Sequence, residues 1–190
     1  MANDPGWTCT CCGERHTELP MAYHAEAPAT WEPGMAERAD CELTPDQCVI
    51  GEHSFVRGLV EIPVIGSGEV FAWGVWVSLS ERNFARATEL WEKPGRESEP
   101  PYFGWLSTEL PLYAPSTVNL KTMHHTRPVG QRPYVELEPT GHPLAVEQRT
   151  GITVERVREI AEALLHPGRG SGVRGAGRPG GRWWRRRPES

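Results

Sequence analysis

Long apolar segments are missing from this sequence of 190 residues. The longest apolar stretch, residues 70–77, is interrupted by glycine and is far shorter than the roughly 20 residues that a membrane-spanning helix needs. The N-terminus lacks the basic, apolar and small-residue segments of a secretion signal. Cysteine is scarce, and its odd number of 5 at irregular positions does not suggest a disulfide framework. We therefore predict a soluble protein of the reducing cytoplasm, with no membrane contact.

Common catalytic and nucleotide-binding signatures are also missing. The sequence contains no phosphate-binding loop, Rossmann glycine motif, Gly-x-Ser-x-Gly, His-Glu-x-x-His or Ca²⁺-binding loop. Its length suits one domain that buries its own core without help from crosslinks. The missing signatures favour a non-catalytic binding or interaction module over an enzyme.

Positive charge is scarce except at the C-terminal end. Residues 167–190 contain 7 arginines, 7 glycines and one acidic residue, so this segment carries a charge of +6. Subtracting +6 from the whole-chain charge of −5 leaves −11 for residues 1–166. We predict a single acidic domain over 1–166, whose partner would be a basic protein or peptide, and a disordered Arg/Gly-rich tail over 167–190. Nucleic acid would bind only through the tail, because phosphate neutralisation needs clustered lysine and arginine.

Hydrophobic periodicity predicts an α+β fold: a mostly antiparallel sheet with a few helices packed on it. Alternating patterns predict strands at 54–62 and 69–79, and apolar residues on both faces place the second strand in the centre of the sheet. Further strands are predicted at 102–107, 117–122 and 133–137. Helices are predicted from Ser80 to about Lys93, over 142–149, and from Thr153 to the His166-Pro-Gly sequence.

Two features of the predicted strands concern packing. Gly74 lies between two tryptophans and suggests a close backbone approach or a bulge. Four tryptophans at strand and helix positions are predicted to fill the core, with the floor of a ligand groove as the alternative. These four are Trp73, Trp76, Trp91 and Trp105.

Cys9 and Cys12, followed by Gly13, have the spacing of half a zinc knuckle, which we place at 7–20. His16 is within reach as a third ligand, and Cys11 lies beside the pair as a substitute. The fourth ligand is assigned to Cys48, with Cys41, His24 or a distant histidine folded back as alternatives. Free thiols without metal are the competing interpretation. A redox Cys-x-x-Cys is less favoured, because the residues after Cys12 are a poor helix start.

Four polar residues are the candidates for an enzyme site if the protein is catalytic. Arg57, His125, His142 and Glu147 would have to converge in one pocket to support an unknown reaction. The competing interpretation treats them as surface histidines, salt bridges and solvated strand charges.

Several ordered motifs resemble a known family. They are Phe55-Val-Arg-Gly58, Trp73-Gly-Val-Trp-Val-Ser-Leu-Ser-Glu-Arg-Asn-Phe84, Pro101-Tyr-Phe-Gly-Trp105, Asn119-Leu-Lys-Thr122 and His142-Pro-Leu-Ala-Val-Glu-Gln-Arg149, after Cys9-x-x-Cys12-Gly13. Over about residues 7–166 this pattern resembles the bacterial domain-of-unknown-function family numbered 2199. The resemblance implies a single-domain bacterial protein and implies no particular activity.

Overall fold

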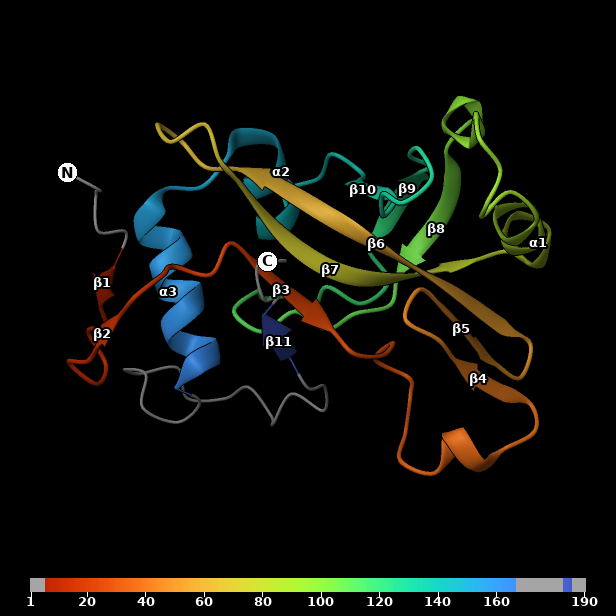
Figure 1. Ribbon diagram of the computed structural model, residues 1–190, viewed down its shortest axis with the longest axis horizontal. Helices are drawn as coiled ribbons and strands as arrows, with labels where there is room; N and C mark the ends of the chain where they lie inside the picture. The colour runs from red at the N-terminus through yellow and green to blue at the C-terminus, as the bar shows by residue number, and fades with distance from the viewer. Residues whose placement is uncertain (1–5, 167–182, 186–190) are drawn as a thin grey trace.

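The structure is a computed structural model that describes residues 6–166 and 183–185 (Figure 1). Its elements confirm the predicted α+β class. The strands are β1 (Trp7–Thr8), β2 (Arg15–His16), β3 (Ala22–Ala25), β4 (Cys41–Leu43), β5 (Gln47–Ile50), β6 (His53–Pro63), β7 (Val70–Leu79), β8 (Tyr102–Leu106), β9 (Lys121–His125), β10 (Tyr134–Leu137) and β11 (Trp183–Arg185). The α-helices are α1 (Glu81–Glu89), α2 (Pro143–Thr150) and α3 (Val154–Leu165), with short 3₁₀ turns at Met35–Glu37 and Arg96–Ser98.

The long β6–β7 hairpin organises the sheet (Figure 1). One edge of β6 pairs first with β5 and then, in parallel, with β10. The edge of β7 that faces away from β6 pairs in the same way with two strands, the parallel strand β3 and the antiparallel strand β8. Because β8, β9 and β10 follow one another as antiparallel neighbours, strands β6 to β10 form a closed ring. Most pairs are antiparallel, as predicted.

Strand alternation explains the core inside this ring. Val56, Val60 and Ile62 of β6 are fully buried, as are Phe71 and Val75 of β7. The other face of β7 is covered around Trp76, which packs in a second cluster with Ala25, Cys48 and Phe55, while Val70 at the start of the strand is exposed. The apolar residues on both faces of β7 therefore correspond to a strand in the centre of the sheet, as predicted.

Gly74 marks a close approach, as the sequence suggests. A Cβ atom at this position would lie 2.0 Å from Nδ1 and 2.8 Å from Cγ of His24 on the neighbouring strand β3. Only glycine leaves room for this buried imidazole ring.

The helices begin where the sequence predicts. The side chains of Ser80 and Thr153 accept hydrogen bonds from the backbone N–H groups at the start of α1 and α3. Helix α1 ends at Glu89 and not near Lys93, because the N–H of Trp91 bonds to the carbonyl of Thr88, three residues back, and tightens the last turn. The strand predicted at 117–122 is shifted to β9, since 117–120 forms a turn into the strand.

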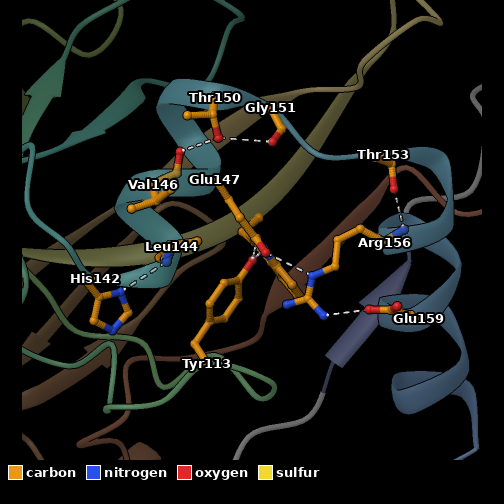
Figure 2. A network of polar contacts seen from close by, with 11 residues as sticks. Tyr113, His142, Leu144, Val146, Glu147, Thr150, Gly151, Thr153, Arg156 and Glu159 are labelled. Atoms are coloured by element: carbon orange, nitrogen blue, oxygen red, sulfur yellow. Dashed lines mark hydrogen bonds and ion pairs between the residues drawn. The ribbon is translucent and has the colours of Figure 1, made fainter.

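A polar network joins α2 to α3 (Figure 2). The hydroxyl of Tyr113 donates to Glu147 Oε2 at 2.5 Å and accepts from Trp73 Nε1 at 3.2 Å. Arg156 of α3 donates from Nε to Glu147 Oε1 at 2.9 Å and from Nη1 to Glu159 Oε2 at 3.0 Å. Burial and the charge of Glu147 raise the pKa of Tyr113, which keeps its hydroxyl protonated as a donor. The network therefore fixes α3 against the barrel.

Two predicted features differ in detail. Trp73 and Trp76 are fully buried and Trp91 packs partly against the core, but 41% of Trp105 is exposed. Three residues of the segment predicted to be disordered form β11, which pairs with β3. The rest of that predicted tail, 167–182 and 186–190, lies outside the described residues.

Candidate metal centre

The N-terminal cysteines lie on a tight turn between two very short strands. β1 and β2 pair antiparallel, with Trp7 opposite His16. The N–H of Cys9 donates to the carbonyl of Glu14 at 2.9 Å, and the N–H of Gly13 donates to the carbonyl of Cys9 at 2.9 Å. Gly13 has φ 74°, a left-handed conformation that glycine adopts without strain. The turn therefore brings three neighbouring thiols to one side.

A histidine from the far end of the domain completes a four-residue cluster. Sγ of Cys9, Cys11 and Cys12 and a ring nitrogen of His166 all lie within 4.8 Å of one another. The Cys9 and Cys11 sulfurs are 2.9 Å apart, and Cys12 Sγ is 3.5 Å from His166 Nε2. Cys9 is buried, and the other three are half-buried.

These separations fit a tetrahedral metal ion. Metal–sulfur bonds of about 2.3 Å and metal–nitrogen bonds of about 2.0–2.1 Å place tetrahedral ligand atoms roughly 3.5–3.8 Å apart. The separations within the cluster, from 2.9 Å for Cys9–Cys11 up to 4.8 Å, bracket these values. Three thiols and one imidazole are a donor set that binds transition metals strongly, so the cluster could hold a metal ion.

Helix α3 delivers His166 to the cysteine turn. The N–H of His166, which follows the last residue of the helix, donates to the carbonyl of Glu162. The carboxylate of Glu162 accepts hydrogen bonds from the backbone N–H of Thr10 at 2.5 Å and from its hydroxyl at 2.7 Å. Beneath these contacts, Trp7, Cys9 and Ala161 form a small buried cluster. The turn and the helix end are therefore aligned by packing as well as by polar contacts.

The thiols share their protons unequally. Burial acts to raise the pKa of Cys9, but hydrogen bonds from Cys11 and Cys12 outweigh it and lower that pKa. The hydrogen bond to Cys9, together with burial and the neighbouring negative charges, raises the pKa of Cys11 to about 12. Cys9 is thus the thiol of this pair that ionises first, and a bound cation would favour the thiolate form of Cys11.

Two residues of the predicted ligand set, His16 and Cys48, do not belong to this cluster. The ring of His16 stacks on Trp7, with centroids 4.8 Å apart, and lies next to His166, with centroids 5.6 Å apart. Cys48 is buried in β5 in the separate cluster around Trp76. Of the alternatives for the fourth ligand, Cys41 on β4 and His24 on β3 are not in the cluster, whereas a distant histidine folded back, His166, is part of it. The structure instead places Cys11 and His166 beside Cys9 and Cys12.

His166 could not be assigned from sequence spacing. It lies 154 residues from Cys12, and only the packing of α3 against the turn brings the two together. The sequence indicates only that His166 follows an amphipathic helix, and it does not indicate which part of the fold the end of that helix contacts.

The four candidate catalytic residues serve different parts of the fold. Arg57 donates to the carbonyls of Ala25 at 2.7 Å and Pro45 at 3.1 Å, and burial lowers its pKa to about 10. His125 Nε2 lies 2.8 Å from Glu136 on the outside of the barrel.

The other two candidates lie just before α2 and within it. The ring Nδ1 of His142 accepts from the N–H of Leu144 and caps the helix, while Glu147 takes part in the network with Tyr113 and Arg156 (Figure 2). Arg57, His142 and Glu147 therefore each have a structural role with separate partners, and His125 pairs with a surface carboxylate.

Within residues 6–166 and 183–185, no helix combines the length and the apolar character needed to cross a membrane.

Comparison with known proteins identifies a family without a known activity. No curated protein and no solved structure matches the chain. Residues 8–152 match the family model described as an uncharacterized protein conserved in bacteria, DUF2199. The matched region contains the three clustered cysteines but ends before α3 and His166. Since the match covers most of the sequence, this chain belongs to the bacterial family DUF2199.

Proposed function

We propose that the protein is a non-catalytic interaction module whose N-terminal turn is locked onto α3 by a structural Zn²⁺ ion. The observation that carries the proposal is the cluster of Cys9, Cys11, Cys12 and His166. Thiolate and imidazole ligands favour Zn²⁺ over Mg²⁺ or Ca²⁺, which prefer oxygen. Four protein ligands fill a tetrahedral shell, as in structural zinc sites, and leave no position for a catalytic water.

The ion would stabilise a part of the fold that is weak without it. β1 and β2 contain two residues each, and an isolated pair of this length is not stable in water. Apart from the cluster, this pair is held to α3 mainly by the Thr10–Glu162 hydrogen bonds and the small core around Trp7. Metal binding would add its free energy to folding, because the unfolded chain does not present the four ligands together.

The dispersed catalytic candidates support an interaction module over the alternative, an enzyme of unknown reaction. Arg57 joins the end of β3 to the turn between β4 and β5, His142 caps a helix, and Glu147 joins two helices, so all three are engaged in maintaining the fold. Zinc held by free thiols also suits a reducing compartment such as the cytoplasm.

Elemental analysis of the full chain, purified without a histidine tag, tests the site. We expect about one zinc ion per chain, lost in the Cys11→Ser and His166→Gln variants. Cys48→Ser and His16→Gln are matched controls that remove the same donor types outside the cluster, and both should keep their zinc. Co²⁺ substitution should give thiolate charge-transfer absorption in the wild type and in both controls.

The outcomes separate two ligand sets. Zinc lost in the His16 and Cys48 variants, but kept in the Cys11 and His166 variants, would replace the proposed ligand set with the one predicted from spacing. A wild-type protein without metal, even after refolding with Zn²⁺, would refute the zinc site altogether.

A further inference from the structure

Three apolar side chains are exposed together on the outside of the barrel. Phe103 and Trp105 lie on β8 and Met123 on β9, with 44%, 41% and 36% of their surfaces exposed. Phe103 is directly opposite Met123 across the strands, and the rings of Phe103 and Trp105 are perpendicular, with centroids 5.3 Å apart. We refer to these three residues as the aromatic face.

Strand alternation places these side chains outside. Tyr102, Gly104 and Leu106 of β8 point into the core and are buried, so the two residues between them must face outward. Exposed clusters of large apolar side chains are uncommon on soluble domains and often mark interaction sites. Aromatic residues and methionine are also enriched at protein interfaces.

A small pocket opens beside Trp105. It has a volume of about 210 Å³, and Trp105, Leu120, Leu137 and Ala145 form its apolar walls. Pockets for small-molecule ligands usually enclose roughly 300–1,000 Å³, so this one is small for such a ligand. Its size suits a single side chain of a docked partner.

Carboxylates line the edge of the aromatic face. Glu136 of β10 lies opposite Met123, so Phe103, Met123 and Glu136 form one row across three strands. In the next row Trp105 lies opposite Lys121, which is bonded through its backbone to Glu138. The side chains of Glu136 and Glu138 are 54% and 48% exposed. Each contacts one side chain of its own fold, His125 Nε2 at 2.8 Å from Glu136 and Lys121 Nζ at 3.5 Å from Glu138, and a partner's cation would share or replace that contact. Since neighbouring strands lie about 4.8 Å apart, the Cα atom of each glutamate lies roughly 10 Å from the Cα atom of the aromatic residue in its row.

We propose that the aromatic face docks a cationic segment of a partner protein. An apolar side chain of that segment would enter the pocket beside Trp105, while its lysine or arginine side chains would reach Glu136 and Glu138. An arginine would also stack favourably on the exposed indole ring. This inference rests on the proposed function as an interaction module, but it does not depend on zinc.

Charge selects this partner over others. Residues 1–166 carry a net charge of −11, which repels nucleic acid and anionic lipid surfaces. The same surface on a second copy would carry the same negative charge. A cationic peptide is the partner whose charge complements this surface.

Selection from a phage-displayed library of random dodecapeptides on the full-length protein tests the proposal. Selected phage are counter-selected on a Phe103→Ser, Trp105→Ser double variant, and enriched peptides are measured by fluorescence anisotropy. We expect sequences that combine lysine or arginine with an aromatic or aliphatic residue. Binding should weaken at least tenfold in the double variant and about tenfold, with reduced salt dependence, in Glu136→Lys, Glu138→Lys.

A matched control is Ile65→Ser, which removes another exposed apolar side chain in the turn between β6 and β7. It should bind the peptides like the wild type, and all variants should keep the wild-type melting temperature within a few degrees.

The proposal is overturned if no peptide is enriched, if the enriched peptides lack basic residues, or if the double variant binds them unchanged. Peptides resembling residues 182–187 would replace the external partner with the C-terminal segment of this chain. A failed zinc analysis leaves this test intact, because the aromatic face shares no residue with the metal cluster.

Discussion

His124 provides a quantitative test of the barrel core. This residue of β9 is only 1% exposed, and its ring is nearly parallel to that of Tyr102, with centroids 6.3 Å apart. Burial lowers the pKa of His124 from 6.5 to about 4, and the charges of His125 and Arg96 act in the same direction. The native ring therefore stays neutral at pH values where the unfolded chain binds a proton.

The sign and size of the effect follow from this difference. Below pH 6.5 the unfolded state binds more protons than the native state, so the free energy of unfolding falls as the pH decreases toward 4. Between pH 7 and pH 5, proton binding to the unfolded ring should lower the stability by about 2 kcal/mol.

Urea unfolding monitored by tryptophan fluorescence at several pH values measures this loss. His124→Phe keeps a flat ring but cannot titrate, so its stability should depend less on pH by about 2 kcal/mol. Any loss of metal at low pH affects both proteins, and the difference between them isolates the histidine. Identical pH dependence in the wild type, His124→Phe and His124→Gln would refute the reasoning.

Two further substitutions test packing and the polar network. Gly74→Ala would place a methyl group against the buried ring of His24, and we expect a loss of about 1–3 kcal/mol in urea unfolding. Glu147→Gln removes the negative charge that faces the half-buried guanidinium of Arg156, and we expect a loss of about 1–2 kcal/mol, visible as a lower melting temperature.

Each substitution has a control within the same chain. Gly141→Ala adds the same methyl group where no atom lies within 4 Å, so its stability should stay within about 0.5 kcal/mol of the wild type. Glu159→Gln removes the other carboxylate bonded to Arg156, but this side chain is 65% exposed and should contribute at most about 0.5 kcal/mol. Equal effects of a substitution and its control would contradict the packing argument or the network argument, respectively.

Local patterns predicted the elements that pack through their own periodicity. Alternation located β6 and β7, and capping residues located the starts of α1 and α3, because these signals depend on neighbours in the chain. The closure of the ring could not be predicted from local patterns. It requires β6 and β7 each to pair with two different strands along one edge. The strands of two to four residues before β6 are too short to show periodicity.

The candidate site was predictable only for its local half. The spacing of Cys9 and Cys12 indicates the turn, and the adjacent Cys11 is a substitute ligand on the same local evidence. The position of His166 depends on how α3 packs. That packing depends on two contacts that the sequence does not reveal, Arg156 with Glu147 and Thr10 with Glu162. Trp105 is a similar case in a strand. Its residue type suggests a core position, but the register of β8 turns its side chain outward.

The closed ring has a consequence for the order of folding. The β6–β7 hairpin joins Pro63 to Val70 and forms within one short segment, whereas the parallel pair that closes the ring joins Leu59 to Tyr134. By loop-length scaling, closing the longer loop costs about 2 kcal/mol more in chain entropy. We therefore expect the hairpin to form early and the β6–β10 seam to form last. Substitutions along the seam should then mainly accelerate unfolding, while those in the hairpin should slow folding.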